Sequence, residues 1–198
     1  MASLQILAGK RILVTGAARG LGRDFAQAAA EAGAAVVMAD ILDDLVQEEA
    51  DQLANVGLIA SAVHIDLSQK VSIQQAVQTA VSTLGGLDGL INCAALATGV
   101  GGVDMMEYDE ALWDRVMTVN VKGTWLVSQA CVPHLKASGQ GKIINIASDT
   151  ALWGAPKLMA YVASKGAILS MTRSMASELG VDNICVNTIS PGLTLVEA

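Results

Sequence analysis

Short apolar runs alternate with longer segments of helical periodicity along the whole chain of 198 residues. The runs are rich in aliphatic and β-branched residues and are bounded by Gly, Asp or Asn, which predicts six buried strands. These predicted strands cover Arg11–Thr15, Ala35–Ala39, Ser61–Ile65, Leu87–Asn92, Lys142–Ala147 and Asn183–Ile189. Strands that alternate this regularly with helices need right-handed crossovers and a parallel sheet. The pattern therefore predicts an α/β fold, a doubly wound parallel sheet with helices on both faces (a Rossmann fold).

The segments between the strands carry apolar residues at helical spacing. One such segment runs from Leu21 to Ala32 and stops at Gly33, and another runs from Ile73 to Leu84 and stops at Gly85. Glycine directly after the last periodic residue is typical of a helix end. No internal repeat, low-complexity segment or linker interrupts the alternation, so we expect a single domain spanning residues 1–198.

Composition and charge exclude several function classes. A chain with 53% hydrophobic and only 16% charged residues is not disordered. Its net charge of −7 and the absence of a basic cluster argue against a nucleic-acid partner. The first positive charges follow a short apolar stretch, which is the wrong order for a secretory signal, and glycines and polar residues interrupt the most apolar window, residues 84–103. We therefore expect a cytoplasmic protein without a membrane span.

Cysteine and histidine are too few and too scattered for a metal or disulfide scaffold. Cys93, Cys131 and Cys185 are far apart, odd in number, and accompanied only by His64 and His134. Neither a zinc site nor a disulfide framework follows from such spacing. Reduced thiols and no bound metal are the expectation.

The first predicted strand leads directly into a glycine-rich segment, Thr15–Gly22, with the spacing G-x3-G-x-G. In doubly wound sheets, ligands bind beyond the carboxyl ends of the strands. Here backbone N–H groups and a helix N-terminus would converge on an anion such as a phosphate. Gly16 would allow the tight turn, Gly20 the approach of phosphate oxygens, and Gly22 the packing of helix on strand. A purely structural turn is the alternative interpretation.

Asp40 follows the second predicted strand, where an acidic side chain in dinucleotide folds accepts both hydroxyls of the adenosine ribose. A phosphate on that ribose about 4 Å from the carboxylate would be repelled by about 4 kcal/mol at an effective dielectric near 20. Asp40 therefore favours NAD over NADP, whereas Arg19 could hold a 2′-phosphate and favours NADP. The alternative role for Asp40, a helix N-cap, is better suited to Asp43 or Asp44.

Three residues further along form a candidate catalytic group. Ser148 follows the fifth predicted strand, and Tyr161 and Lys165 are four residues apart, on one face of the next predicted helix. Lowering the pKa of a tyrosine from about 10 to near 7 needs about 4 kcal/mol, which Lys165 and a cationic nicotinamide together would supply. Tyr161 would then serve as a general acid and base.

Taken together, these motifs resemble the short-chain dehydrogenase/reductase family, NAD-dependent type, from about residue 8 to residue 194. The family's glycine motif is Thr15 to Gly22, its Y-x-x-x-K is Tyr161 to Lys165, and its serine is Ser148. The further motifs are an Asp that contacts adenine, an N-N-A-G segment, a helix asparagine and a P-G pair. They correspond to Asp66 in His64–Leu67, to Asn92–Ala95, to Asn120, and to Pro191 and Gly192.

The resemblance implies a role for each catalytic candidate. Tyr161 would exchange a proton with the substrate oxygen, and Ser148 would hold that oxygen by a hydrogen bond. Lys165 would hold the nicotinamide ribose and lower the pKa of Tyr161, and Asn120 would anchor a water that carries protons from Lys165 to solvent. A helix-interior residue that satisfies a local backbone group is the alternative for Asn120. The expected cofactor contacts are Gly16, Arg19, Gly20, Leu21, Gly22, Asp40, Asp66, Leu67, Asn92, Ala94, Tyr161, Lys165, Pro191, Gly192 and Thr194.

The chain departs from the family pattern at three places. Cys93 and Ala95 replace the second Asn and the Gly of N-N-A-G. Val196 stands where the family often has Thr or Ser for the nicotinamide carboxamide, so that contact is either lost or made by Thr194. Family members also continue beyond this point through a substrate-covering segment and a last strand, so we expect a chain that lacks its C-terminal strand and substrate lid.

The expected function is an oxidoreductase that transfers a hydride between NAD(H) and an alcohol or ketone, with a secondary alcohol favoured. An NADP(H)-dependent ketoreductase is the first alternative, and a non-catalytic dinucleotide-binding regulator is a remote one. Part of the substrate wall would be apolar with one hydroxyl, and Trp153 could equally belong to the core. The residues expected there are Leu96, Ala97, Thr150, Leu152, Trp153 and Leu158.

Two long predicted helices, Asp109–Lys136 and Pro156–Gly180, carry apolar residues on more than one face. A helix that covers a sheet needs only one apolar face, so a second one indicates another buried surface. In the family the corresponding helices pack against a symmetry mate. We therefore expect a homodimer, or a homotetramer built by a second two-fold axis.

Overall fold

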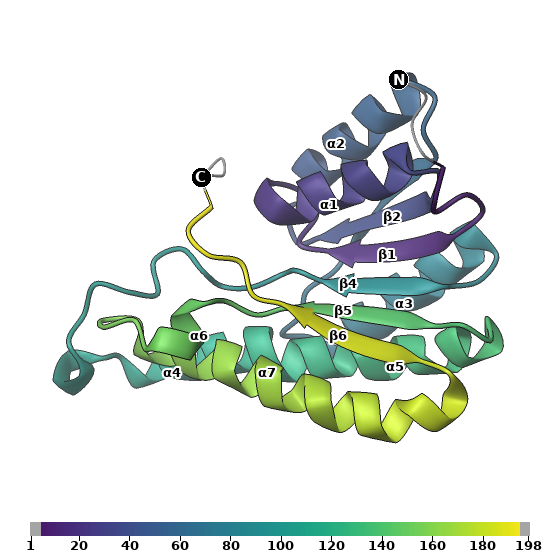
Figure 1. Ribbon diagram of the computed structural model, residues 1–198. Helices are drawn as coiled ribbons and strands as arrows, with labels where there is room; N and C mark the ends of the chain where they lie inside the picture. Colours follow the sequence, from purple (N-terminus) through teal and green to yellow (C-terminus); the bar gives the residue numbers. More distant parts are fainter. Residues whose placement is uncertain (1–4, 195–198) are drawn as a thin grey trace.

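A computed structural model describes residues 5–194 as one six-stranded sheet in which all strands are parallel (Figure 1). The strand order is β3-β2-β1-β4-β5-β6, so the expected fold class is confirmed. The strand ends lie within two residues of those expected. The strands are β1 (Arg11–Thr15), β2 (Ala35–Asp40), β3 (Ala60–His64), β4 (Gly89–Asn92), β5 (Lys142–Ile146) and β6 (Cys185–Ile189).

Helices cover both faces of this sheet. The first face carries α1 (Gly20–Glu31) and α2 (Asp43–Asn55), and the second carries α3 (Lys70–Leu84), α5 (Thr124–Ala137) and α7 (Met159–Leu179). The shorter elements are η1 (Met105–Glu107), α4 (Glu110–Val116), η2 (Met117–Gly123), α6 (Thr150–Trp153) and η3 (Gly180–Asp182). Across residues 5–194, none of the helices has the length and apolar character to cross a membrane.

The two faces of the sheet are packed by different kinds of side chain. Under α1, small residues such as Ala26 and Ala29 lie against Val14 and Met38 of the strands, which lets the helix approach the sheet closely. The other face is filled mainly by larger aliphatic residues. This use of alanine explains how a chain with only 3% aromatic residues packs a core.

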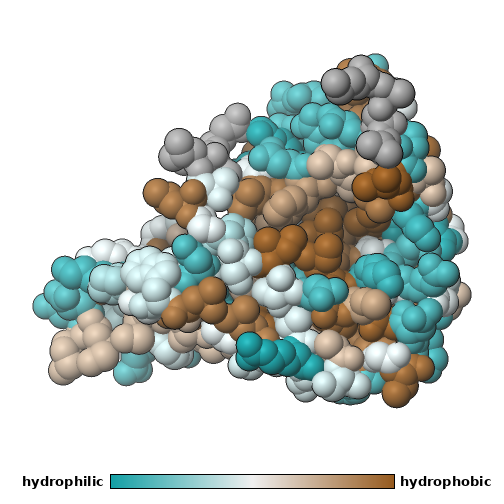
Figure 2. Space-filling model, viewed as in Figure 1, coloured by the Kyte–Doolittle hydropathy of each residue, from teal (hydrophilic) through white to brown (hydrophobic). Residues whose placement is uncertain are grey.

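Part of the first face has no helix over it. Between α1 and β6, Figure 2 shows apolar residues at the surface over the central strands. Ile91 and Ile144 are half-buried there, and Ile189 on the edge strand β6 is 44% exposed. Within residues 5–194, the helices on this face are confined to the β1 side of the sheet, over β1, β2 and β3.

The first long predicted helix is interrupted. Instead of one helix over Asp109–Lys136, the structure has α4, the π-helical segment η2, and α5 in succession. A π-helix widens the turn and re-aims the residues in it, and such segments are frequent at functional sites. Asn120 lies in the middle of η2 and is buried. The second predicted helix, Pro156–Gly180, is found as α7.

A buried polar ladder joins β4 and β5 to the helices of the second face. It consists of Ser128, Asn92, Asn145 and Thr172. The Asn92 amide donates to Ser128 Oγ (3.0 Å) and to Asn145 Oδ1 (2.9 Å), and the Asn145 amide donates to Thr172 Oγ1 (2.9 Å). Asn92 and Asn145 are register partners at the carboxyl ends of their strands. The ladder therefore connects α5, β4, β5 and α7 at one level.

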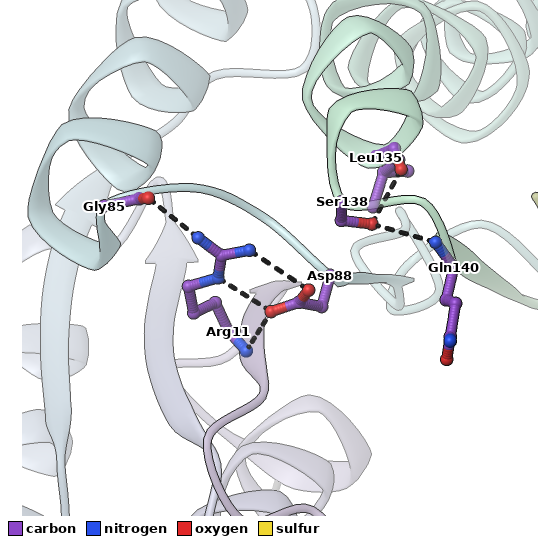
Figure 3. A network of polar contacts seen from close by, with 6 residues as sticks. All are labelled: Arg11, Gly85, Asp88, Leu135, Ser138 and Gln140. Atoms are coloured by element: carbon purple, nitrogen blue, oxygen red, sulfur yellow. Dashed lines mark hydrogen bonds and ion pairs between the residues drawn. The ribbon is translucent and has the colours of Figure 1, made fainter.

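At the opposite, amino edge of the sheet, Arg11 clamps β1 to the segment before β4 (Figure 3). Its Nε lies 2.7 Å from Asp88 Oδ2, and its Nη1 donates to the Gly85 carbonyl oxygen (2.7 Å). The backbone N–H of Arg11 also donates to Asp88 (3.0 Å). The hydrogen bonds from Arg11 hold the pKa of Asp88 below its ordinary value. Nearby, Ser138 closes the end of α5 by donating to the Leu135 carbonyl.

We expect Asp88→Asn to lower the free energy of unfolding by about 1–3 kcal/mol at pH 7, because hydrogen bonds to a charged group are lost. The pKa of Asp88 is lower in the folded state, so its stabilisation is fully present above the unfolded carboxyl pKa near 4 and disappears as pH falls through the folded value. Urea unfolding at pH 7 and pH 3 checks this. Asp51→Asn, at an exposed helical carboxylate, is the control and should change stability by less than about 0.5 kcal/mol. An equal loss for Asp88→Asn at both pH values would contradict the ionic explanation.

Candidate active site

The carboxyl ends of the strands, at the left edge of the sheet in Figure 1, gather most of the candidate residues. The glycine-rich turn follows β1 and packs against the turn after β4. Gly16 has φ +71°, and a Cβ on it would lie 2.6 Å from Ala94 Cα. A Cβ on Gly22 would lie 2.0 Å from the Gly16 carbonyl oxygen. Only glycine fits at these two positions. Gly16 allows the tight turn, and Gly22 allows the helix to pack closely on that turn.

The start of α1 has the chemistry of an anion seat. The helix begins at Gly20, which has φ +56°, and its N-cap Arg19 makes no side-chain hydrogen bond to the helix. No acidic residue occupies the first turn, so the N–H groups of Gly20, Leu21 and Gly22 are left for a ligand. The Arg19 side chain is exposed beside them. These features fit the pyrophosphate of a dinucleotide.

Asp40 connects this turn to the end of β2. Its Oδ2 accepts a hydrogen bond from the Ala18 N–H (3.0 Å), its Oδ1 accepts one from the Leu42 N–H (3.1 Å), and the residue is only 9% exposed. Helix α2 begins at Asp43 with Leu42 as its N-cap, so Asp40 does not cap it. Asp43 and Asp44 lie in the first turn, not at the N-cap as the alternative interpretation had it. Asp40 is thus held beside the glycine turn with lone pairs left to accept ribose hydroxyls.

A pocket of about 340 Å³ lies beyond the end of β3, next to Asp40. Asp66 lines it, and the Asp66 carboxylate accepts hydrogen bonds from the Ser68 N–H (2.8 Å) and hydroxyl (2.7 Å). Leu67 does not line the pocket but is buried and packs against Gly123. A Cβ on Gly123 would lie 2.8 Å from the Cβ of Leu67. The remaining lining residues are Ile41, Ser68, Leu96, Asp114, Arg115, Thr118 and Val119. The pocket has the position and partly apolar walls expected for adenine.

Thr15 organises the turn after β4, a role that motif spacing did not reveal. Its buried Oγ1 accepts hydrogen bonds from the N–H groups of Cys93 (3.2 Å) and Ala94 (3.3 Å). The side chain of Asn92, in contrast, belongs to the polar ladder below the sheet and not to the cleft. Any contact of Asn92 with a cofactor would therefore come from its backbone.

Ser148, Tyr161 and Lys165 come together at this edge. Ser148 lies near the Tyr161 phenol, and Lys165 Nζ lies 5.6 Å from the centroid of the Tyr161 ring. The buried Lys165 ammonium donates to the Ile146 carbonyl at the end of β5 (2.7 Å). An ammonium has three protons, so two remain for other partners.

Burial dominates the proton affinities in this group. It raises the pKa of Tyr161, and the nearby Ser148 hydroxyl opposes that rise. The expected lowering of the phenol pKa includes the charge of a bound nicotinamide and stays a prediction for the cofactor complex. Burial also lowers the pKa of Lys165 to about 8, because the charged ammonium is removed from water. Burial raises the pKa of Cys93 to about 11, and the charge of Lys165 opposes this rise. Cys93 is therefore a neutral thiol close to the catalytic group.

Asn120 ties together the loop after β4 and helix α7. Its Oδ1 accepts a hydrogen bond from the Leu96 N–H (2.7 Å), and its amide donates to the Leu96 carbonyl (3.2 Å) and to Ser164 Oγ (3.1 Å). The backbone groups that it satisfies therefore belong to another element, not to its own helix. Ser164 in turn donates to the Tyr161 carbonyl (2.7 Å). Asn120 thus links the π-helical segment to the backbone of Tyr161.

The turn after β6 approaches the same edge. The Pro191 carbonyl accepts a hydrogen bond from the Asp149 N–H (3.0 Å), and a Cβ on Gly192 would lie 3.4 Å from Asp149 Oδ2. Thr194 is exposed, with its hydroxyl bonded to the Gly192 carbonyl (3.2 Å). Val196 lies outside the described residues. Among residues 5–194, no group of three or more His, Cys, Asp or Glu side chains is arranged to hold a metal ion.

The segments after β4 and β5 project beyond the sheet beside the start of α7, the helix that carries Tyr161 (Figure 1). Leu152 and Trp153 of α6 are 69% and 62% exposed, so Trp153 is not a core residue. Tyr161 itself packs against a small buried cluster that includes Val100 and Ala160. Thr150, which is expected in the substrate wall, donates its hydroxyl to Ser148 Oγ (2.8 Å).

Comparisons with known proteins agree with this geometry. A sequence model described as short chain dehydrogenase matches residues 10–198. A 3-alpha-(or 20-beta)-hydroxysteroid dehydrogenase of Mycobacterium bovis is 40% identical over 187 residues, which are 94% of this chain and 70% of that protein. An NAD-dependent glycerol dehydrogenase of Listeria innocua is 37% identical over 188 residues, which are 95% of this chain and 72% of that protein.

A solved structure of a dehydrogenase/reductase from Sinorhizobium meliloti superposes with a TM-score of 0.91 and 34% sequence identity. The match covers 100% of this chain and 77% of that one. The family model, the relatives and the fold thus agree with the motifs gathered at the carboxyl edge. The chain belongs to the short-chain dehydrogenase/reductase family of oxidoreductases, whose dehydrogenases use nicotinamide cofactors.

Proposed function

We propose that the protein is an NAD-dependent dehydrogenase that interconverts a secondary alcohol and its ketone, with Tyr161 as the general acid and base. The observation that carries this proposal is the meeting of Ser148, Tyr161 and Lys165 at the same sheet edge as Asp40 and the glycine turn. The relatives described above, which act on hydroxylated substrates according to their names, support the same class of reaction.

The residues present fit a dinucleotide. Its pyrophosphate would lie on the N-terminus of α1, its adenosine ribose on Asp40, and its adenine in the pocket lined by Asp66. Lys165 has two protons left for the nicotinamide ribose. The turn of Pro191 and Gly192 and the exposed Thr194 would face the nicotinamide. When bound, the nicotinamide supplies the hydride acceptor for alcohol oxidation and the hydride donor for the reverse reaction.

The chain's own residues would handle the proton. Tyr161 Oη takes the hydroxyl proton of the alcohol, and Ser148 donates a hydrogen bond to the same oxygen. Lys165 places a positive charge beside the phenolate that forms. Both protons of the Asn120 amide are donated, to Leu96 and to Ser164, so a water on Asn120 would have to donate to one of its oxygens. The side-chain oxygen already accepts the Leu96 N–H (2.7 Å), and the backbone oxygen accepts the Thr124 hydroxyl (2.8 Å).

We infer an apolar group next to the carbinol of the substrate. Leu96, Leu152, Trp153 and Leu158 lie on the segments that project beside Tyr161. Ala97 lies on the same loop as Leu96 and is exposed. Residues 94–114 and 150–160 of these segments contain one lysine and no arginine. That lysine, Lys157, pairs with Asp104 (3.5 Å). A neutral alcohol or ketone with an apolar flank fits these segments better than a carboxylate or a phosphate ester does.

The direct test is the formation of reduced cofactor from NAD and a series of secondary alcohols, followed by absorbance. Turnover of at least one apolar secondary alcohol, with slower turnover of its carboxylated analogue, is the expected result. If the protein binds NAD tightly but neither oxidises any alcohol nor reduces any ketone, the non-catalytic regulator is favoured. Preference for NADPH and a ketone would favour the ketoreductase alternative, which the exposed Arg19 supports.

We also propose that the protein forms a homodimer through α5 and α7. Trp125 on α5 is 45% exposed, and several apolar residues along α7, such as Ala163 and Met171, are only half-buried. Pairing these helices across a two-fold axis would bury them. Sedimentation equilibrium of the purified chain should give a dimer, or a tetramer if a second interface forms. A stable monomer at micromolar concentration would contradict this assembly.

The three free thiols suit a reducing compartment such as the cytoplasm.

A further inference from the structure

We propose that Thr150 is a positioning residue that makes Ser148 a hydrogen-bond donor toward the reacting oxygen. The inference rests on the proposed function, because it assigns Ser148 and Tyr161 their chemistry. It goes beyond that function by giving Thr150 a task that its place in the sequence, two residues after Ser148, does not reveal.

The contacts of Ser148 Oγ carry the proposal. This oxygen accepts a hydrogen bond from the Thr150 hydroxyl (2.8 Å) and another from the Thr150 N–H (3.3 Å). Ser148 is buried, and it follows β5, the strand whose Ile146 carbonyl holds Lys165. Both acceptor bonds therefore come from one residue at the start of the short helix α6.

The hydroxyl group of a serine has one proton and two lone pairs. Because Thr150 occupies both lone pairs of Ser148 Oγ, the only hydrogen bond left to Ser148 is the one in which its own proton is donated. On the cleft side, Ser148 lies near the Tyr161 phenol and opposes the rise in its pKa. The Ser148 proton must therefore point at the Tyr161 oxygen, or at a substrate oxygen that lies between the two.

A donor with a fixed direction suits the proposed reaction. Negative charge develops on the substrate oxygen and on the phenol, and a hydrogen bond donated to either oxygen stabilises it. Without the Thr150 hydroxyl, Ser148 Oγ would have a free lone pair and could accept a hydrogen bond from the Tyr161 hydroxyl, which would favour the neutral phenol. Hydrogen bonds in a chain also polarise one another, so the bond from Thr150 strengthens the one that Ser148 donates.

Other groups act on Tyr161 but do not depend on Thr150. Burial and the charges of Cys93, if ionised, and of Asp149 raise the pKa of Tyr161. Lys165 lies over the ring from α7. A change at Thr150 that leaves these groups in place should therefore act on Tyr161 through Ser148 alone.

The competing interpretation is structural: the Thr150 hydroxyl closes the turn between β5 and α6 and has no part in the reaction. Thr150→Val separates the two, because it keeps the shape and the N–H of the residue and removes only the hydroxyl. Thr150→Ser keeps the hydroxyl. Thr188→Val is the matched control, since Thr188 Oγ1 is buried without a hydrogen-bond partner in the described part of the chain.

The first readout does not require turnover. The protein has only two tyrosines, Tyr108 and Tyr161, so carbon-13 labelling of tyrosine gives two phenol signals whose ionisation NMR can follow with pH. We expect the midpoint for Tyr161 to rise in Thr150→Val, because the phenolate loses a directed donor, and to return towards the wild-type value in Thr150→Ser. The Tyr108 signal, whose hydroxyl donates to the Val100 carbonyl, should not move.

The second readout is turnover of a secondary alcohol. We expect kcat for Thr150→Val to fall about tenfold, in line with the loss of one directed hydrogen bond, with the KM for NAD within about twofold. The pH at which kcat/KM is half-maximal should move upward, and Thr150→Ser should restore most of the activity. In a Ser148→Ala background, Thr150→Val should have no further effect, since its target is gone.

The outcomes are distinguishable. If the Tyr161 midpoint and kcat are unchanged in Thr150→Val while the wild type oxidises alcohol, the positioning role is wrong and the proposed function stands. If Thr150→Val only lowers the melting temperature, the structural interpretation is right. If no variant turns over alcohol but the Tyr161 midpoint shifts, the Ser148 geometry stands and the proposed function fails.

Discussion

Replacing Tyr161 by phenylalanine should lower kcat for alcohol oxidation by about 10²- to 10⁴-fold, the range that proton transfer by a positioned side chain contributes. The substitution removes the phenol oxygen that takes the proton and keeps the ring that packs against Val100 and Ala160. Cofactor binding should change little, because Lys165, and not the phenol oxygen, is the proposed main contact of the nicotinamide ribose. Steady-state kinetics together with the dissociation constant for NAD check both halves of the expectation.

Tyr108→Phe is the matched control, since it removes the other tyrosine hydroxyl of the chain. That hydroxyl donates to the Val100 carbonyl (2.8 Å) and so supports the loop after β4 without reaching the reacting atoms. We expect its kcat to stay within a few-fold of the wild type. A Tyr161→Phe enzyme within tenfold of the wild type would mean that another group moves the proton.

The second large effect concerns the choice of cofactor. The unmodified protein should bind NAD about 10²- to 10³-fold more tightly than NADP, because a 2′-phosphate beside the Asp40 carboxylate would be repelled by up to about 4 kcal/mol. Asp40 is 9% exposed and fixed by two backbone N–H groups, so the carboxylate has little freedom to turn away from the phosphate. Asp40→Asn removes the charge, keeps an acceptor for the Ala18 N–H, and should narrow the preference to within about tenfold.

Asp43→Asn serves as the control for this experiment. Asp43 is exposed near the same strand end and pairs with His64 (2.6 Å), so its loss should leave the preference intact. Fluorescence titration with both cofactors gives the ratio directly. If the unmodified protein already prefers NADP, then Arg19 and not Asp40 decides the choice.

The strands and the glycine turn could be predicted because each depends on a local signal. Arg11–Thr15 is a strand with the expected ends, since it is a short continuous apolar run, Ile-Leu-Val, and the glycine turn follows at once. Gly16 and Gly22 lie where only glycine fits, and so the motif spacing located the turn correctly. Asp40 and Ser148 follow from the same logic, because strand ends in a parallel sheet converge.

The features that could not be predicted depend on contacts between distant residues. The π-helical turn around Asn120 leaves no mark in the apolar periodicity, because Val119 and Val121 fit an ordinary helix equally well. Leu96, the hydrogen-bond partner of Asn120, lies in a distant segment of the chain, the loop after β4. The pKa of Tyr161 has a similar limit: spacing reveals the nearby Lys165, whereas burial, which raises the phenol pKa, depends on how distant segments pack around the ring. Sequence spacing says nothing of hydrogen-bond partners either, and so the bond from Thr150 to Ser148 could not be predicted.

The buried polar ladder under β4 and β5 has a consequence for how the active site is aligned. Asn145 faces the helices of the second face, and Ser148 stands three residues further along the same chain direction. If β5 slipped by one residue against β4, Asn145 would turn its amide to the opposite face and leave the Asn92 and Thr172 groups unpaired in a dry interior. The ladder thus fixes the register of β5 against β4. A shifted register would lose these hydrogen bonds and destabilise the fold. The ladder therefore also fixes the positions of Ser148 and of the carbonyl that holds Lys165.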